Sequence, residues 1–415
     1  MSSDKNDSVR SSYDLNGDDE DMIESENIST AGDLGDRALN SNRRTDPTVD
    51  ILDATENGSI VEFNKLTSFP LWTSFNSSIM PLPLPQTPTP TKDKETPRLE
   101  YISCLIYLSF FAVLGVLARY LVMKFFGPTV AGVTSENSPI YIGLPCNMVS
   151  SFLMGWLGIV FRDEIAGLSD HLAIGLTTGF LGSLSSFSTW NQKMLELFVN
   201  GQYVFAFVGF LLGFFLIAYS IRLGIGTAKC LKEVVKERTK YKTGSFGCKF
   251  KHRHLVVMAV LLVMLCVLWS VSGKLLKNDF DSEGGSLWMA CLVAAPGVWI
   301  RWFLARLNGR GLGKTRQLKW VPFGTLIVNV SSATIMGGLS FLQKEVEEKK
   351  YHTILIGIKL GFSGCLSTIS AFIAEYNAME ESSKNWRAYA YAFTTLLLSF
   401  VFGILIYCVP IWTRT

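Results

Sequence analysis

Two segments rich in glycine, serine and threonine lie inside apolar stretches of this 415-residue chain, at residues 179–190 and 361–372. A transmembrane helix is easily interrupted by such a run, and an interruption is tolerated only where it is buried in protein or lines a cavity. The break frees carbonyl oxygens, which are hard ligands for small cations. Close helix packing through small residues is the alternative interpretation. The candidate Na⁺ ligands are the backbone carbonyls of Gly182, Ser185, Gly364 and Ser367.

The two segments belong to a longer repeat. A shift of 182 residues aligns them without a gap and also aligns Arg119 with Arg301 and Asn147 with Asn329. Polar and charged side chains inside a membrane are costly and often functional. An amide NH₂ can donate to an anion, so both asparagines are candidate anion ligands, with a helix-to-helix hydrogen bond as the alternative. The arginines are expected to supply electrostatic or structural support.

Apolar spans must hold these residues. The chain is 48% hydrophobic and 18% charged, and its mean hydropathy is +0.28, which indicates an integral membrane protein. Nine spans are predicted, at residues 101–123, 140–161, 171–190, 203–225, 254–272, 287–306, 321–342, 353–374 and 387–409. Four belong to each copy, and the fifth links them. The predicted fold is all-α, with two inverted four-helix repeats, one linking transmembrane helix and a broken third helix in each repeat.

Composition and charge divide the chain further. The predicted parts are a disordered polar cytoplasmic tail (1–98), a first repeat (100–226), a basic cytoplasmic loop with the linking helix (227–273) and a second repeat (286–410). Lys and Arg collect on the cytoplasmic side of membrane proteins, and here they collect in residues 226–253 and 307–319. The N-terminus is therefore predicted to be cytoplasmic and the C-terminus extracellular.

Other classes of function have little support in the sequence. The eight cysteines form no CxxC pair, and the four histidines lack metal-ligand spacing. Residues 309–315 resemble a phosphate-binding loop, but Asn308 stands where the first glycine is required. No enzyme and no nucleic-acid partner is expected. A coupled secondary transporter for a small anion and a receptor or scaffold without transport activity remain alternatives.

The repeated motifs in combination identify a family. GxxxR, a buried Asn and GFxGxLSxxSxF together resemble the double-barrelled fluoride channels (Fluc), and two fused copies with a linking helix resemble its eukaryotic fluoride exporters of the fungal type. The resemblance covers about residues 100–410. It implies passive fluoride export across the lipid bilayer of the plasma membrane by a single chain. It also implies narrow pores at the interface of two antiparallel domains, with Na⁺ at their centre.

The resemblance also assigns aromatic residues to two pores. In that family the first aromatic of the motif in one domain faces the second aromatic of the other. This rule pairs Phe187 with Phe372 in one pore and Ile369 with Trp190 in the other. Only the first pair keeps two phenyl rings, whose positive edges can face an anion. The serines that follow the first motif position, Ser188 and Ser370, are also candidate pore residues.

Hydroxyl groups strengthen the difference between the two pores. Tyr391, Thr395 and Ser399 recur on one helical face of the last span. Hydroxyls can replace water around a dehydrating anion, although back-bonding to helix carbonyls is the alternative. The residues compared with them in the fourth span are almost wholly apolar, namely Tyr203, Phe207, Leu211 and Phe215.

The second copy also has Thr325 where the first has Gly143, so the second copy keeps the fuller polar set. We therefore predict one working pore and one degenerate pore, the latter marked by Ile369 and Trp190. The predicted working pore uses Asn329, Thr325, Phe187, Phe372, Tyr391, Thr395 and Ser399.

Overall fold

The computed structural model describes residues 97–135, 140–239, 251–280, 283–311 and 318–414, with residues 25, 27, 28, 30–33 and 35 of the tail. Within these ranges the chain is helical, and its only strand-like pairing is an isolated bridge between Asn308 and Pro322. Seven of the described helices are long and apolar enough to cross a membrane, or eight if one pair bent by 68° is counted as a span. The predicted all-α, multi-pass class is confirmed, whereas the count of nine spans stays a prediction.

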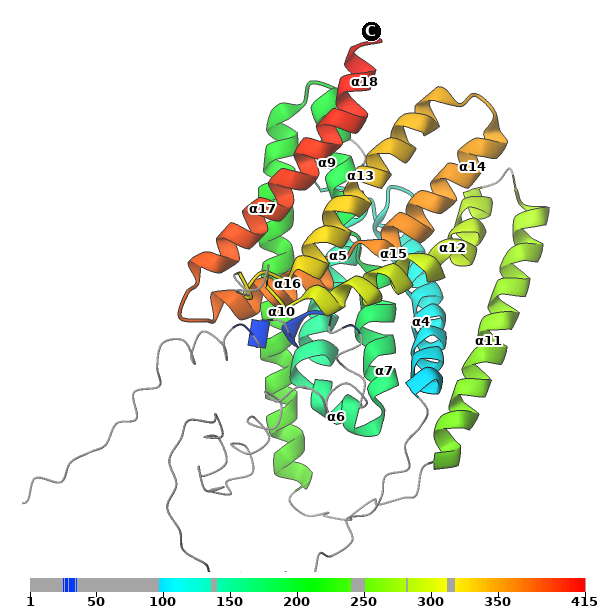
Figure 1. Ribbon diagram of the computed structural model, residues 1–415. Coiled ribbons are helices and arrows are strands. Elements are labelled where there is room, and N and C mark those ends of the chain that lie inside the picture. Colours follow the sequence, from blue (N-terminus) through cyan, green and yellow to red (C-terminus); the bar gives the residue numbers. More distant parts are fainter. Residues whose placement is uncertain are drawn as a thin grey trace, which may run out of the picture.

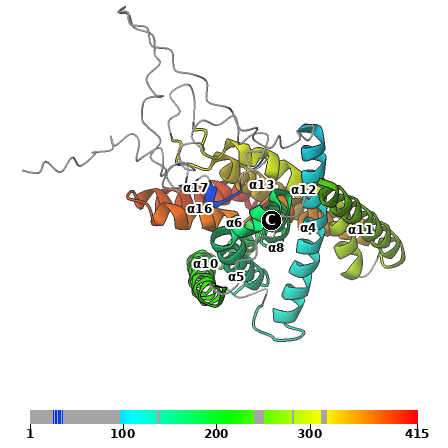
Figure 2. The same cartoon turned by 90° about the horizontal axis from the view of Figure 1, so that it is seen from below.

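The first copy runs from α4 to α10. Its elements are α4 (Pro97–Phe126), α5 (Leu144–Leu153) with a π-helical continuation (Met154–Val160), α6 (Arg162–Leu168), α7 (Asp170–Ile174), a π-helical stretch (Gly175–Leu181), α8 (Gly182–Leu184), α9 (Phe187–Val199) and α10 (Tyr203–Thr239). Helix α11 (Lys251–Asn278) links the copies. It lies at the outer edge of the bundle beside α4 and α12 (Figures 1 and 2), and only 11% of its most apolar part is buried.

The second copy repeats this order. Its elements are α12 (Glu283–Leu304) with a 3₁₀ turn (Ala305–Leu307), α13 (Phe323–Glu345), α14 (Lys349–Ile358) with a π-helical stretch (Lys359–Ser363), α15 (Gly364–Leu366), α16 (Ser370–Glu380), α17 (Trp386–Gly403), a further π-helical stretch (Ile404–Cys408) and α18 (Val409–Trp412). Corresponding helices run in opposite directions in Figure 1: α4 upward and α12 downward, α10 downward and α17 upward. The second copy is therefore inverted relative to the first.

Both third helices break at equivalent positions. The single turns α8 and α15 start 182 residues apart, and each ends at a serine with extended backbone. Ser185 has φ −87° and ψ 160°, and Ser367 has φ −83° and ψ 159°. The predicted broken third helix is thus present in both repeats. Because neither serine continues the helix, the last carbonyls of α8 and α15 lack partners within their own helix.

A small part of the tail differs from the sequence prediction. Ile28 is 1% exposed within the largest hydrophobic cluster, and Asp33 is 3% exposed. This segment lies below α16 in Figure 1. An apolar anchor and a buried ionic partner allow it to pack where polar composition alone predicts disorder. The rest of residues 1–96 lies outside the described part of the chain, so the predicted disorder there stays a prediction.

Candidate functional site

The two helix breaks cap one another across the interface between the copies. The Ser185 hydroxyl oxygen accepts from the backbone N–H groups of Ile369 and Ser370, both at 3.2 Å. Reciprocally, the Ser367 hydroxyl oxygen accepts from the N–H of Ser188 at 3.1 Å, and the two hydroxyls of that pair are 2.9 Å apart. Each serine therefore acts as an N-terminal cap for the opposite copy's helix. The hydrogen bonds that cap the helix breaks are therefore also contacts between the two copies.

The repeated arginines also cross between the copies. Arg119 donates to the carbonyls of Leu360 at 2.9 Å and Gly364 at 3.0 Å, both in the second copy. Arg301 donates to the carbonyl of Gly182 in the first copy, at 3.0 Å. Guanidinium groups thus satisfy carbonyls that the helix breaks release. This geometry agrees with a supporting role for the arginines.

These contacts occupy carbonyls that the sequence assigned to Na⁺. Gly182 and Ser367 accept from Arg301 at 3.0 and 3.2 Å. Gly364 accepts from Arg119 at 3.0 Å. The donor chemistry fits a hard cation, because a carbonyl oxygen has two lone pairs and both breaks meet here. A Na⁺ ion would nevertheless share these oxygens with two guanidinium charges, and the sodium site stays a prediction.

The two asparagines hold the breaks of their own copies. The Asn329 amide donates to the carbonyl of Thr368 at 3.0 Å and accepts from its N–H at 2.8 Å. In the first copy, Asn147 accepts from the N–H of Ser186 at 2.9 Å and donates to the hydroxyl of Tyr141 at 2.7 Å. This arrangement resembles the alternative of a hydrogen bond between helices, except that the partner is the irregular backbone at the helix break. An anion-binding role for either amide stays a prediction.

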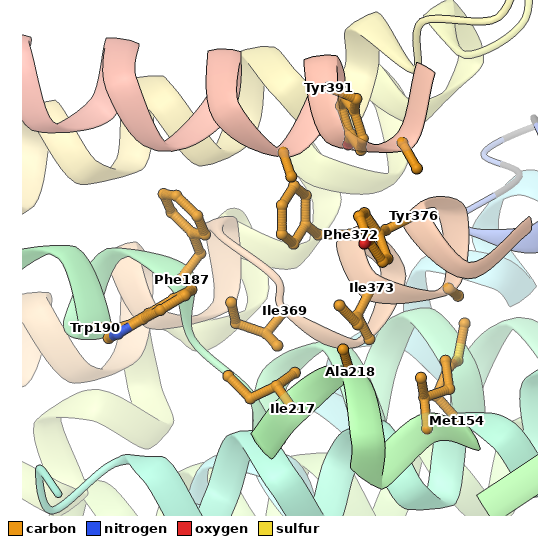
Figure 3. Close-up of a cluster of buried hydrophobic side chains, with 14 of the residues drawn as sticks. Met154, Phe187, Trp190, Ile217, Ala218, Ile369, Phe372, Ile373, Tyr376 and Tyr391 are labelled. Atoms are coloured by element: carbon orange, nitrogen blue, oxygen red, sulfur yellow. The ribbon is translucent and has the colours of Figure 1, made fainter. Parts of the chain in front are cut away.

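The predicted aromatic pair comes together in the core. The ring centroids of Phe187 and Phe372 are 5.8 Å apart, and the ring planes are inclined by 65°. On its other side, Phe372 approaches Tyr391 with a centroid separation of 5.2 Å. Figure 3 shows Phe372 between these two rings, while Ile369 points toward the side of Ile217. The three rings form a continuous row from α9 to α17.

A buried carboxylate, which the sequence analysis did not identify, lies at the Tyr391 end of this row of rings. Glu375 is fully buried. One of its oxygens, Oε1, accepts from the Thr325 hydroxyl at 2.6 Å and from the Asn308 amide at 3.3 Å. The other oxygen, Oε2, accepts from the Tyr391 hydroxyl at 2.7 Å. Two predicted pore residues, Thr325 and Tyr391, are therefore joined through Glu375.

The described tail segment packs against Glu375 and its hydrogen-bond partner Asn308. The backbone carbonyl of Asp33 accepts from Asn308 at 3.2 Å. Its carboxylate accepts from the Thr178 hydroxyl at 2.8 Å and lies 3.2 Å from Arg301 Nε. That last contact is an ion pair and not an aligned hydrogen bond, because neither atom has a hydrogen-bond partner within the described part of the chain. Gly32 packs directly against Glu375, where a Cβ would clash with the Glu375 side chain.

The hydroxyl stripe continues from Glu375 along α17. Tyr391, Thr395 and Ser399 are all buried. Thr395 donates to the carbonyl of Tyr391 at 2.8 Å, as the back-bonding alternative describes. The Ser399 hydroxyl has no partner among the described residues, although its carbonyl accepts from Asn191 at 3.3 Å. The three hydroxyls therefore lie on one buried face but make different bonds.

The comparison with the fourth span was wrong. The four residues compared there point outward, with exposed fractions of 55%, 65%, 57% and 64% for Tyr203, Phe207, Leu211 and Phe215. Spacing alone does not fix which way a uniformly apolar helix is rotated, because lipid-facing and core-facing positions are both apolar. The comparison must instead use the 182-residue shift.

In that register the stripe matches Gly209, Gly213 and Ile217. The Trp190 indole donates to the carbonyl of Gly209 at 3.4 Å, and a Cβ at Gly213 would lie 3.0 Å from the indole ring. Ile217 is 1% exposed. The first copy therefore fills with tryptophan the space that the second copy lines with hydroxyls, which strengthens the predicted asymmetry.

A small cavity marks the opposite side of the interface. It measures about 10 Å³ and is lined in part by Gly143, Asn147 and Arg119. The equivalent of Gly143 is Thr325, whose side chain reaches Glu375. In the first copy the Tyr141 ring packs against this position instead, since a Cβ built on Gly143 would lie 3.2 Å from it.

The structure adds site residues that the sequence analysis missed. Glu375 directly follows the predicted span 353–374, and its match in the repeat is Lys193, so the alignment gave no signal. Its position inside helix α16, next to the motif, is the signal that could have found it. Asn308 lies in a predicted basic loop, and Asp33 lies in the predicted tail. Both are recognised only through contacts distant in sequence.

Comparison with known proteins gives a consistent family signal. The sequence pattern of the family described as CrcB-like protein, Camphor Resistance (CrcB), matches residues 106–226 and again 288–407. A Geobacter metallireducens protein named fluoride-specific ion channel FluC is 33% identical over 127 residues, which are 31% of this chain and 98% of that relative. FluC 2 of Staphylococcus saprophyticus is 34% identical over 114 residues, which are 26% of this chain and 87% of that relative. No solved structure matches significantly.

Proposed function

Because the chain belongs to the CrcB-like family, whose pattern matches it twice, we propose that it is a passive, fluoride-selective channel that lowers cytoplasmic fluoride. The relatives reported above are named fluoride-specific ion channels. The observation that carries the proposal is the edge-to-face pair of Phe187 and Phe372, which continues to Tyr391. Ring edges and hydroxyls can surround a small anion without a buried counter-charge.

One pathway conducts, and it follows the second copy's polar side chains. It begins near Glu375, passes the two phenyl rings and continues past Thr395 and Ser399 on α17. Supporting evidence is the buried hydroxyl face on one side and the tryptophan-filled space on the other. The side with Ile369 and Trp190 is degenerate. Asn329, Asn147, Ser188 and Ser370 support this pathway by fixing the helix breaks.

The driving force for export is electrical. Fluoride enters cells from acidic surroundings mainly as neutral HF and ionises in the cytoplasm, where the ion cannot recross lipid. An inside-negative potential is worth about 2.3 kcal/mol per charge per 100 mV. A selective passive pore is therefore sufficient for efflux. We place the channel in the plasma membrane, because that membrane separates the cytoplasm from the surroundings.

The proposed orientation has a cytoplasmic N-terminus and an extracellular C-terminus. The start of α4 and the C-terminus lie at opposite ends of the bundle in Figure 1, which supports termini on opposite sides of the membrane. A glycosylation acceptor added after Thr415 should be modified. If only an acceptor placed in the 226–253 loop is modified, the proposed orientation is wrong.

We also propose that a structural Na⁺ lies between the two helix breaks and that one chain forms the whole channel. Both proposals are supported by the crossed caps of Ser185 and Ser367, which bring two carbonyl-rich breaks together within one chain. Exposed apolar side chains on α10 and α11 fit direct contact with lipid. The ion's role would be to hold the breaks together.

Fluoride efflux from liposomes tests the main proposal. Purified protein should release fluoride, measured with a fluoride electrode, when valinomycin clamps the potential, and should release far less chloride. Release no greater than that from empty liposomes would overturn the proposal. A passive channel moves fluoride without a pH or Na⁺ gradient, so a strict requirement for either would instead identify a coupled transporter.

A further inference from the structure

The described residues of the N-terminal tail contact the helical bundle in three different ways. Ile28 is 1% exposed within the largest hydrophobic cluster. The backbone carbonyl of Thr30 accepts a hydrogen bond from Arg162, and the Asp33 carboxylate forms an ion pair with Arg301. Ordering a polar segment costs conformational entropy. An apolar anchor, a backbone hydrogen bond and an ion pair in so short a stretch therefore indicate a specific docked position.

Two glycines allow the tail to come this close. A Cβ built on Gly35 would lie 2.7 Å from the backbone nitrogen of Arg306 and 2.8 Å from the carbonyl oxygen of Trp302. Gly35 also has a φ of +61°, which residues with a side chain rarely adopt. A Cβ on Gly32 would clash with the side chain of Glu375. The tail therefore packs without a gap against the end of α12 and against the buried carboxylate.

The docked tail fills a space whose counterpart in the other copy is a cavity. That cavity, of about 10 Å³, is lined in part by Arg119 and Leu360. The 182-residue shift matches these two residues with Arg301 and Thr178. The Asp33 carboxylate contacts both of them, at 3.2 Å from Arg301 Nε and 2.8 Å from the Thr178 hydroxyl. The inverted fold thus builds two equivalent spaces, and the tail fills one of them.

The filled space lies at the cytoplasmic entrance of the proposed pathway. In the proposed orientation the start of α4 faces the cytoplasm, and the described tail segment lies below α16 on that side of the bundle in Figure 1. Glu375, where the pathway begins, packs against Gly32. Fluoride that leaves the cytoplasm therefore meets the tail before it reaches the two phenyl rings.

Asp33 also neutralises a charge that would attract an entering anion. Its carboxylate is 3% exposed and lies 3.2 Å from Arg301 Nε. Opposite charges at this distance in a buried site largely cancel each other's field. If the tail withdrew, Arg301 would present its positive charge toward the vacated space. The docked tail thus opposes the entry of an anion both by its volume and by its charge.

We propose that the N-terminal tail is a tethered plug that closes the working pathway at its cytoplasmic entrance. Asp33 is the anionic tip of the plug, and Gly32 and Gly35 are its points of close contact. The plug rests on the proposed function, because it regulates that same pathway. Docking and release of the tail set the fraction of channels that are open. The tail is therefore an autoinhibitory element, and loosening it should speed fluoride efflux.

Two glycines with similar backbone geometry provide a matched test. Gly132 has a φ of +64°, and a Cβ there would meet nothing within 4 Å. Gly35→Ala and Gly132→Ala therefore place alanine in the same left-handed region, but only the first creates a clash. Efflux from liposomes at a clamped potential should rise about tenfold in Gly35→Ala, because an open state populated at about 10% becomes the major state. Gly132→Ala should match the parent protein.

A second pair of full-length variants decides the case if Gly35→Ala fails to fold, as judged by elution and thermal unfolding. Asp33→Asn removes the charge with little change of shape, and Asp163→Asn changes an exposed residue of α6. Efflux should rise several-fold in the former and stay at the parent level in the latter.

The outcomes separate the plug from the function on which it rests. Efflux at or below the parent level in folded Gly35→Ala or Asp33→Asn would overturn the plug and leave the tail a purely structural role. Equal rises in Gly35→Ala and Gly132→Ala would overturn it as well. No fluoride efflux from the parent or from either tail variant would instead overturn the proposed function.

Discussion

Arg119 donates to the carbonyl of Gly364, and Arg301 donates to that of Gly182, each at 3.0 Å and each across the interface between the two copies. Each arginine therefore spans both breaks, because Arg119 also donates to the Ser183 carbonyl and Arg301 to the Ser367 carbonyl within their own copies. The exchange also distinguishes the two arginines, because the carboxylate of Asp33 lies 3.2 Å from Arg301 Nε. An inverted pair that looks symmetric in sequence thus carries a charge asymmetry at its centre.

Asp33→Asn tests that ion pair. The substitution keeps the shape and can keep the hydrogen bond from Thr178, but it leaves Arg301 paired only with carbonyls. Removing one partner of a buried pair costs about 3–5 kcal/mol, and the remaining carbonyl bonds favour the lower end. The thermal unfolding midpoint should fall clearly. Asp163→Asn on an exposed surface is the control, and equal midpoints for both variants would show that the pair contributes no stability.

Phe372→Ala and Ile369→Ala separate the two predicted pores. Both side chains are buried, and their loss should cost similar stability, about 3–5 and 2–5 kcal/mol respectively. Fluoride efflux from liposomes should collapse in Phe372→Ala and survive in Ile369→Ala. Equal loss of efflux in both variants would contradict a single working pore.

Tyr391→Phe probes the hydroxyl bonded to Glu375. The change keeps the ring beside Phe372 and removes the donor that lies 2.7 Å from Glu375 Oε2. Loss of a hydrogen bond to a buried acceptor costs about 1–3 kcal/mol, and the pathway loses its first hydroxyl. Efflux should fall several-fold. Tyr389→Phe changes an exposed tyrosine on the same helix and should leave efflux unchanged.

Removal of Na⁺ tests the proposed central cation. Replacing sodium with a large organic cation at constant ionic strength should lower the unfolding midpoint, because an ion that binds only the folded state stabilises it by about 2.7 kcal/mol at a hundred times its dissociation constant. Unchanged midpoints over the whole sodium range would argue that the two guanidinium groups alone satisfy the breaks.

Local features of the chain were predictable because their causes are local. The breaks fall at Ser185 and Ser367, inside the glycine- and serine-rich runs that predicted them. The crossed pairing that brings Phe187 close to Phe372 was instead predicted by the resemblance to a known family, applied to the positions that the repeat makes equivalent. Repetition carried this information, since it fixes which residues are equivalent without any knowledge of rotation or depth.

Features that depend on distant partners were not predictable. Whether Asn329 faces an ion or the backbone depends on Thr368, 39 residues away. Glu375 was missed because its match in the repeat is Lys193, and a comparison that looks for identical residues does not select such a position. The outward direction of Phe207 was misjudged because an apolar residue suits lipid and core equally.

The exchange of arginines imposes an order on biosynthesis. Arg119 leaves the ribosome 245 residues before Gly364, and at about 5–20 residues per second that interval lasts roughly 12–50 s. Throughout it, Arg119 of the newly inserted first copy lacks two of its carbonyl acceptors, those of Leu360 and Gly364. Asp33, made first of all, cannot pair until Arg301 has been inserted. A chain that stops between the copies therefore leaves Arg119 with donors that the second copy would have satisfied.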